Sequence, residues 1–224
     1  MVKDITNEEK GCAKINLALH VTGIQADGYH ALDSIVVFTD VFDRLFFKRS
    51  LKNVVTLTGE FSGSINVQEN SILQALKLFG NGLTDRFSIN LEKNLPIGAG
   101  LGGGSADAAA VIRFITNNSK HLMPSYEVLS KIGADIPACV LSVASRVGGI
   151  GEIVRPLDMS EINLWVVLVN PDIFVSTGSI FEEVTEKHNQ PLESFIDLSS
   201  TDKFVDYLKR QRNDLQTIAI KKYP

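Results

Sequence analysis

Hydrophobic and polar residues alternate along several short stretches of this chain, which is the pattern of strands with one buried face. In KINLALHV at 14–21 every odd position is aliphatic, so Lys14 and Asn16 are predicted to project together from the other face. DGYH at 27–30 predicts a turn after this strand. The same pattern predicts further strands at 34–38, 44–48, 54–58 and 87–91, and an apolar run predicts a buried strand at 163–169.

Apolar residues at helical spacing predict helices between these strands. NSILQALKLFG at 70–80 has a capping asparagine, helical periodicity and a closing glycine. SADAAAVIRFI at 105–115 follows a glycine-rich stretch, with Ser105 as its predicted N-cap. Shorter helices are expected at 126–133, 177–186 and 202–211, the last with Phe204, Tyr207 and Leu208 facing inward.

Composition narrows the class of protein. The 224 residues are 44% hydrophobic and 21% charged, as in ordinary globular proteins, and a net charge of −4 gives no basic footprint for nucleic acid. Two distant cysteines, Cys12 and Cys139, predict no disulfide framework and suit a reducing compartment. The polar N-terminus lacks the features of a signal peptide, and no apolar run is long enough to span a bilayer. We therefore expect a cytoplasmic protein without a nucleic-acid or membrane partner; the sequence makes no prediction of oligomeric state.

The stretch LPIGAGLGGGSADAAA at 95–110 places a glycine-rich turn between a predicted strand and a predicted helix. Free N–H groups at a helix N-terminus attract anions, and glycines let a phosphate approach the backbone closely. A P-loop needs a lysine before its Ser or Thr, whereas Gly104 precedes Ser105 here. The dinucleotide fingerprint fits by spacing from Gly98 to Gly103, but no acidic residue lies about 20 positions further on.

A third pattern matches at greater length. P-x-G-x-G-L-G-G-G-S-x-D-A-A resembles the ATP-binding motif of the GHMP kinases, the superfamily of galactokinase, homoserine kinase, mevalonate kinase and phosphomevalonate kinase. Within it, the chain resembles the 4-diphosphocytidyl-2-C-methyl-D-erythritol kinase family of the non-mevalonate route to isoprenoid precursors. The matching stretches span nearly the whole chain and are AKINL at 13–17, DGYH at 27–30, GADIP at 133–137, GIGE at 149–152, PDIFVSTGSIF at 171–181 and RNDL at 212–215.

This resemblance implies an α/β (α+β) two-domain GHMP kinase fold. Residues 1–157 would form the ATP-binding domain, related to ribosomal protein S5 domain 2, and residues 158–224 part of a ferredoxin-like domain. The polar connector at 155–162, which contains a proline, agrees with this boundary. Two departures stand out: Ala106 replaces a serine found in many members, and the family's C-terminal Gly-Ser-Gly motif is not in the sequence, so the second domain is expected to be incomplete.

For chemistry, the resemblance implies transfer of a phosphoryl group from ATP, with Mg²⁺, to a hydroxyl of a cytidylylated methylerythritol. Asp135 would be the catalytic base, although an aspartate before Pro137 could also serve only as a turn cap. Lys14 would accompany it, because a nearby cation favours an ionised carboxylate and offsets phosphoryl charge. The alternative for Lys14 is a solvated lysine on a strand.

The resemblance also assigns binding residues. Tyr29 and Phe181 would stack on the cytosine, His30 would bond its polar edge, and Asn16 and Thr177 would make further substrate contacts; Phe181 could instead fill a helix face. Lys93 and Asn70 are candidate ATP contacts, with an exposed lysine and a helix cap as the alternatives. The magnesium ligand stays open, with Asp107 one candidate. The remaining ATP contacts are Pro96, Gly98, Gly100, Leu101, Gly102, Gly103, Gly104 and Ser105.

Two other functions remain open at this point. The chain could be another GHMP alcohol kinase acting on mevalonate or homoserine, or a nucleotide-binding relative without catalysis. The presence of both Lys14 and Asp135 favours catalysis.

Overall fold

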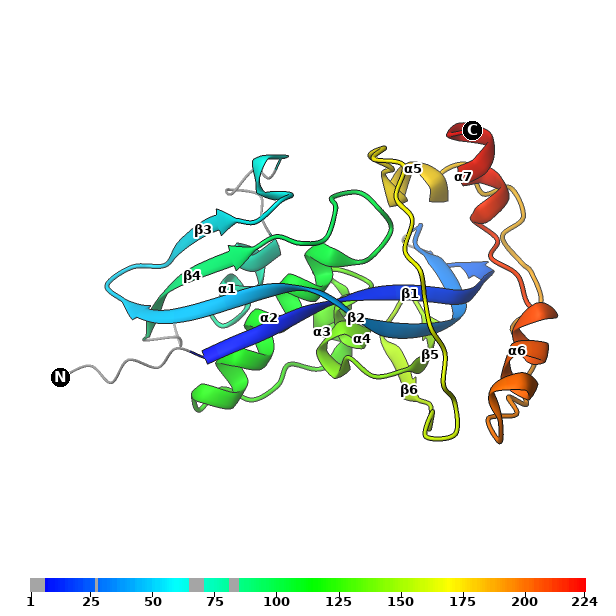
Figure 1. Cartoon of the computed structure of the whole chain (residues 1–224), viewed down its shortest axis with the longest axis horizontal. Helices are drawn as coiled ribbons and strands as arrows, with labels where there is room; N and C mark the ends of the chain where they lie inside the picture. The colour runs from blue at the N-terminus through cyan, green and yellow to red at the C-terminus, as the bar shows by residue number, and fades with distance from the viewer. Residues whose placement is uncertain (1–6, 27, 65–70, 81–84) are drawn as a thin grey trace.

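The computed structural model describes residues 7–26, 28–64, 71–80 and 85–224, and its centre is a six-stranded sheet covered by helices (Figure 1). The strands are β1 (Asn7–Ile24), β2 (His30–Ser50), β3 (Val54–Thr58), β4 (Arg86–Glu92), β5 (Ser145–Gly149) and β6 (Ile153–Pro156). The helices are α1 (Ser71–Leu78), α2 (Gly103–Asn118), α3 (Tyr126–Ser130), α4 (Ile136–Leu141), α5 (Thr177–Phe181), α6 (Thr201–Lys209) and α7 (Gln216–Lys222), with a short 3₁₀ turn η1 (Ser62–Ser64). Among the described residues no helix has both the length and the hydropathy of a bilayer span.

Strand β2 is the central strand of the sheet. β1 pairs antiparallel along one edge of β2, while β4 and β5 share the other edge, giving the order β3-β4-β2-β5-β6. The prediction of two separate strands at 34–38 and 44–48 is therefore wrong. Both belong to β2, because β1 pairs with β2 up to Phe38 and again from Phe42 onward, so the strand continues through the interval.

Strand β1 departs from simple alternation. Its register against β2 shifts at three places, the second of them between Asn16 and Ala18, and each irregularity re-aims the side chains that follow. Ala18 and His20, predicted on the polar face, are buried as well as Leu19. The prediction that Lys14 and Asn16 project together is confirmed, because the Lys14 ammonium donates a hydrogen bond to Asn16 Oδ1 over 2.7 Å.

Helix α2 lies against the sheet at close range because its first turns consist of small residues. All four of its buried alanines face the core, and Gly11 of β1 passes beneath them. A β-carbon at Gly11 would lie 2.7 Å from Asp107 Oδ1, closer than real contacts allow. Further along the helix, Phe114 stacks on Phe47 of β2 with the ring centroids 3.9 Å apart. This packing fixes the start of α2 over β1.

The chain after β6 contributes helices and extended segments. Residues 157–224 are all described, and they contain helices α5–α7 but no named strand; Figure 1 shows the stretch between β6 and α5 as a long extended segment, coloured yellow. The prediction of a buried strand at 163–169 is wrong, since Trp165 is 94% exposed and Val167 86%. No described strand runs beside this segment to complete its hydrogen bonds. The two-domain division and the ferredoxin-like character of 158–224 thus remain predictions.

Hydrogen bonds and apolar packing join this C-terminal region to β1. Residues 212–214 run along β1, where the Leu19 N–H donates to Arg212 O over 3.0 Å and the Asp214 N–H donates to Leu19 O over 2.9 Å. Helix α6 buries Phe204 and Tyr207 against Ala18, as its amphipathic pattern predicts. Helix α5 ends at Phe181, five residues short of the predicted 186.

The packing of α6 predicts a stability effect. Phe204 has no exposed surface, so Phe204→Ala removes buried apolar area and leaves a cavity, and we expect the free energy of unfolding to fall by about 3–5 kcal/mol. Urea unfolding measures it. In the control, Phe195→Ala, a ring that is 77% exposed is lost, and the change should stay within about 0.5 kcal/mol. Equal losses in the two variants would contradict the packing of α6 on the sheet.

Candidate active site

The glycine-rich stretch forms a loop that connects β4 to α2. Gly102 is the N-cap of α2 in a left-handed conformation, φ +66°, which glycine adopts without strain, and its carbonyl accepts the Ala106 N–H over 2.9 Å. The prediction of Ser105 as the cap is therefore wrong, because the helix has already begun at Gly103. Gly100 has no neighbouring atom within 4 Å of the place where a β-carbon would stand, so the loop is open on that side.

This geometry suits an anion. The first N–H groups of a 16-residue helix have no intrahelical partner, and the helix dipole adds positive potential at the same end. Glycines keep side chains out of the approach to these groups. The residues present therefore fit the phosphates of ATP, which would bind along the loop at Gly100–Ser105.

Lys14 and Asp135 form an ion pair beside the loop. Lys14 is 4% exposed, and its ammonium lies 3.1 Å from Asp135 Oδ1, which excludes a solvated strand lysine. Asp135 occupies the N-cap position of α4, but its side chain makes no capping hydrogen bond, so the turn-cap alternative fails. The side chain of Asp135 is 44% exposed, and its carboxylate can therefore reach a bound substrate.

The loop and the ion pair are in direct contact. The backbone N–H of Lys14 donates to Leu101 O over 2.9 Å. A β-carbon at Gly102 would lie 3.3 Å from the Lys14 side chain and 3.7 Å from Asp135 Oδ2. The predicted phosphate site and the predicted base, which are separated by more than thirty residues in sequence, therefore adjoin each other.

Sequence reasoning missed Ser34, which supports this pair from β2. Asn16 accepts from the Lys14 ammonium and donates through Nδ2 to Ser34 Oγ over 2.8 Å. Ser34 in turn donates to Ala18 O over 2.6 Å and is 2% exposed. This buried chain of hydrogen bonds fixes the Asn16 amide, which fixes the lysine. Only the strand register identifies Ser34, because it lies far from Asn16 in sequence.

The turn between β5 and β6 supports Asp135 from the other side. A β-carbon at Gly151 would stand 2.0 Å from the carbonyl oxygen of Ala134, so only glycine lets the two backbones meet. Gly151 also has φ +119°, which other residues rarely adopt. The Glu152 carboxylate accepts the Ile150 N–H over 2.7 Å and closes the turn. This contact sets the backbone immediately before Asp135.

A second group of predicted residues meets where β2 begins. The rings of His30 and Phe181 are 5.3 Å apart, and His30 Nε2 is buried without a hydrogen-bond partner in the part of the chain that is described. Burial, with a further contribution from Lys187, lowers the pKa of His30 below its usual value, so the imidazole is neutral at neutral pH. Tyr29 is 56% exposed in the adjoining turn, and Thr177 is exposed at the start of α5.

One stretch of chain connects the two groups. The Val175 N–H donates to Gly98 O over 2.9 Å, and the Phe174 ring occupies the space beside Gly98. From there the chain enters α5 and reaches Phe181 beside His30. Residues 174–181 thus extend from the glycine loop to the aromatic pair.

Two further predicted residues, Lys93 and Asp107, do not lie on the open face of the loop. Lys93 is 4% exposed, and its ammonium bonds the carboxylates of Asp43 and Asp107, so the exposed-lysine alternative is wrong. Asp107 is 2% exposed beneath the helix, which removes it as an accessible magnesium ligand. Asn70 lies outside the described residues. Within those residues, no group of three or more His, Cys, Asp or Glu gathers to hold a metal.

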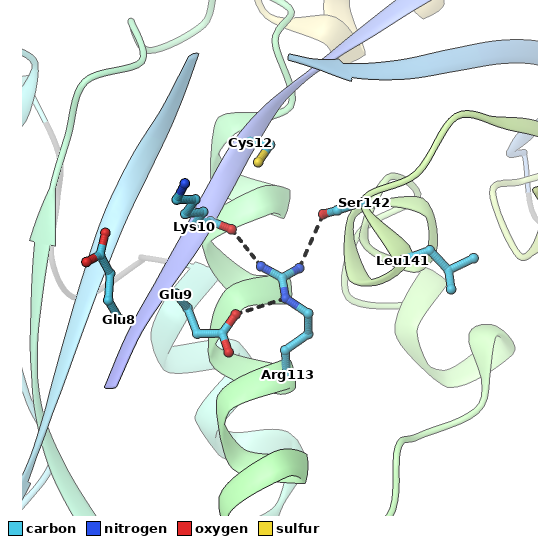
Figure 2. Close-up of a pocket in the computed structure, with 7 residues that line it drawn as sticks. All are labelled: Glu8, Glu9, Lys10, Cys12, Arg113, Leu141 and Ser142. Carbon is cyan, nitrogen blue, oxygen red and sulfur yellow. Dashed lines mark hydrogen bonds and ion pairs between the residues drawn. The ribbon is translucent and has the colours of Figure 1, made fainter. Parts of the chain in front are cut away.

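A separate hollow of about 660 Å³ lies between the start of β1, α2 and α4. Figure 2 shows Arg113 at its centre, where the guanidinium points to Glu9, the carbonyl of Lys10 and Ser142. Arg113 also donates to Cys139 O over 2.8 Å, so its donors are occupied by the protein. None of the catalytic or binding residues predicted from the sequence lines this hollow.

Comparison with known proteins shows the family to which the chain belongs. The family model for the N-terminal domain of GHMP kinases matches residues 70–149. The 4-diphosphocytidyl-2-C-methyl-D-erythritol kinase of Cereibacter sphaeroides (strain ATCC 17025) is 39% identical over 93% of this chain and 74% of its own length. The corresponding kinase of Rhizobium johnstonii is 40% identical over 93% and 71%. This chain belongs to the 4-diphosphocytidyl-2-C-methyl-D-erythritol kinase family. A crystal structure of 4-(cytidine 5'-diphospho)-2C-methyl-D-erythritol kinase superposes with a TM-score of 0.70 at 26% identity, covering 97% of this chain and 79% of that one.

Membership of this kinase family gives meaning to the departure at Ala106. Its side chain is 2% exposed and packs in the core between α2 and the sheet. Ser105, one residue earlier, lies at the protein's partly exposed surface, with its Oγ 3.5 Å from the place of a β-carbon on Gly133. The substitution therefore leaves the hydroxyl on the loop side unchanged.

The contact beneath Asp135 predicts a selective loss of activity. In Gly151→Ala the new methyl group collides with the Ala134 carbonyl and displaces Asp135; because a displacement of about 1 Å can cost roughly 100-fold in rate, we expect kcat to fall by about that factor. Steady-state kinetics measures the fall in kcat, and a binding assay for ATP should show that the affinity for ATP is unchanged. The matched control is Gly148→Ala, where a β-carbon would meet its neighbours at ordinary distances of 3.7 Å or more. If both variants lose the same activity, the turn does not position Asp135.

Proposed function

We propose that this chain is an ATP-dependent kinase that phosphorylates the 2-hydroxyl of 4-diphosphocytidyl-2-C-methyl-D-erythritol, in the non-mevalonate route to isoprenoid precursors. The observation that carries the proposal is the Lys14–Asp135 ion pair against the glycine loop. An anion-binding helix end, a cation and an exposed carboxylate in contact are the parts that phosphoryl transfer to an alcohol requires. The family relationship adds the substrate.

In the reaction, the substrate hydroxyl oxygen forms a bond to the γ-phosphorus of ATP as the bond to the β–γ bridging oxygen breaks and ADP leaves. Asp135 accepts the hydroxyl proton, since its carboxylate is exposed toward the site and not occupied as a helix cap. The ammonium of Lys14 lies beside that carboxylate and offsets charge on the moving group. Asn16 and Ser34 hold the ammonium in place.

The nucleotide is proposed to bind with its phosphates on the backbone amides from Gly100 to Ser105. The loop supplies donors whose positions are fixed before the ligand arrives, so little reorganisation is needed. Mg²⁺ would supply charge neutralisation to the phosphates, and Ser105 is proposed to contribute its hydroxyl from the loop side.

The cytidine end of the substrate is proposed to bind at His30 and Phe181. The Nε2 of the neutral His30 imidazole is buried and has no hydrogen-bond partner among the described residues, and the polar edge of a base can provide one. Phe181 offers an aromatic face beside it, and Tyr29 stands exposed in the adjoining turn. Thr177 at the start of α5 is a further proposed contact.

A mevalonate or homoserine kinase is the competing activity within the superfamily. Neither substrate carries a base, so neither would use the His30–Phe181 pair. A panel of these alcohols against the cytidylylated substrate separates the activities. A nucleotide-binding relative without catalysis would not need Asp135 directed toward the loop beside Lys14.

The role of Asp135 gives the first test of this function. Asp135→Asn removes the proton acceptor but keeps the shape of the side chain, and we expect turnover to fall at least about 100-fold while ATP still binds. Phosphate transfer and calorimetric ATP binding measure the two effects. Asp206→Asn, at an exposed ion pair on α6, serves as the control and should leave turnover unchanged. Full activity of Asp135→Asn would remove this residue from the mechanism.

The aromatic pair gives the second test. Phe181→Leu keeps an apolar side chain but loses the stacking face, so we expect KM for the cytidylylated substrate to rise roughly tenfold with KM for ATP unchanged. Steady-state kinetics with each substrate varied in turn measures the split. Phe195→Leu changes an exposed ring elsewhere and should alter neither constant. A rise in KM for ATP alone would place Phe181 at the wrong end of the site.

A further inference from the structure

Three charged side chains are buried together beneath the glycine loop. Lys93 follows β4, Asp43 belongs to β2 and Asp107 lies in the second turn of α2. The Lys93 ammonium donates to Asp43 Oδ2 and, over 2.9 Å, to Asp107 Oδ2. None of the three is more than 4% exposed. Burial of charge on this scale is costly and calls for an explanation.

Asp43 also holds the backbone at the entrance to the loop. Its Oδ1 accepts the N–H of Asn94 over 2.6 Å and that of Leu95 over 2.8 Å. These two residues directly precede Pro96, where the loop begins. With the Lys93 ammonium on its other oxygen, the carboxylate of Asp43 therefore has three donors.

The cluster reaches the exit of the loop as well. A β-carbon at Gly103, the first residue of α2, would lie 3.0 Å from the Lys93 ammonium and 3.6 Å from Asp43 Oδ2. Asp107 attaches the same ammonium to the helix one turn later. The cluster thus ties β2, the end of β4 and the start of α2 together at both ends of the loop.

Lys93 is consequently not free to act as a phosphate ligand. Its ammonium is engaged by two carboxylates, and although burial opposes the charge, Asp107 and Asp43 raise the pKa of Lys93 above its usual value. A buried ion cluster is in itself weak evidence for stability, because apolar side chains of similar volume often serve as well. What apolar side chains could not supply are the acceptors for the Asn94 and Leu95 amides and the attachment of the helix.

We propose that Asp43, Lys93 and Asp107 are positioning residues that hold the glycine loop and the first turn of α2 in the geometry that receives the phosphates of ATP. The inference rests on the ATP-dependent activity proposed above. It assigns to Lys93 a role beneath the loop and to Asp43 a role that the sequence did not indicate.

The charge balance of the cluster identifies Asp107 as the member whose protonation depends most on pH. Two carboxylates face one ammonium, and Asp107 Oδ1 has no hydrogen-bond partner among the described residues. Gly11 of β1 lies against this oxygen, the Cys139 thiol of α4 is a titratable neighbour, and Lys93 and Asp43 are the charged groups that act on the carboxyl. Burial raises the pKa of Asp107 from 3.8 to about 7, opposed by Lys93 and reinforced by Asp43.

The first test separates nucleotide binding from substrate binding. Asp43→Asn leaves an amide group that cannot serve the Lys93 ammonium and both backbone amides as the carboxylate does, so we expect the Kd for ATP and KM for ATP to rise about tenfold or more. KM for the cytidylylated substrate should remain unchanged. The control is Asp85→Asn, which breaks an exposed pair with Arg49. Unchanged ATP affinity in Asp43→Asn, or an equal rise in both KM values, would overturn the proposal.

The second test does not depend on the stability of Asp43→Asn. Asp107→Asn keeps nearly the same shape and the Asp43–Lys93 pair. In the wild type the folded state binds more protons than the unfolded state between the ordinary aspartate pKa and about 7, so stability falls as pH rises through that window. The variant lacks this loss. The difference between its melting temperature and that of the wild type should therefore shift in favour of the variant as pH rises from about 4 to about 7.

The outcomes of these experiments are distinct. Parallel melting profiles for Asp107→Asn and wild type would overturn the role given to Asp107 in the cluster. Calorimetric ATP binding to the wild type needs no second substrate, so it also separates the two proposals. Wild type that binds ATP but transfers no phosphate would overturn the proposed function, whereas weak ATP binding by Asp43→Asn would still support the positioning cluster.

Discussion

The site depends on the close approach of β1 to the glycine loop. The hydrogen bond from the Lys14 N–H to Leu101 O joins the two backbones, and it places the Lys14 side chain directly beneath the first turn of α2. The absence of two β-carbons permits that approach: one at Gly11 would collide with Asp107 Oδ1 at 2.7 Å, and one at Gly102 would press on the Lys14 side chain at 3.3 Å. Asp135 lies at the start of α4, and from there its carboxylate contacts the same ammonium. The Lys14–Asp135 ion pair is thus a consequence of packing α2 on β1.

Sequence reasoning succeeds where periodicity and a long motif coincide. The strand at 87–91 and the helix after the loop follow from local pattern, and the motif resemblance brings Lys14 and Asp135 together before any coordinates. It fails where the structure depends on distant partners. The extent of β2 is set by β1, and the segment at 163–169 has the composition of a strand without a described neighbour to pair with.

Buried polar residues were the least predictable part of the site. Ser34 and Asp43 both lie in β2, within stretches dominated by apolar residues, and nothing local distinguishes them from exposed strand positions. Lys93 has the opposite difficulty: a lysine before a loop suggests exposure, yet two carboxylates from other elements neutralise it in the core.

Residues 174–181 connect the glycine loop to the His30–Phe181 pair. One end of this segment is bonded to the loop at Gly98, and the other places Phe181 beside His30. The Val175–Gly98 hydrogen bond and the Phe174 ring packed on Gly98 join the loop to the segment that leads into α5. The contacts that Asp43 and Lys93 make beneath the loop therefore support the loop from one side, while residues 174–181 connect it to the His30–Phe181 pair on the other.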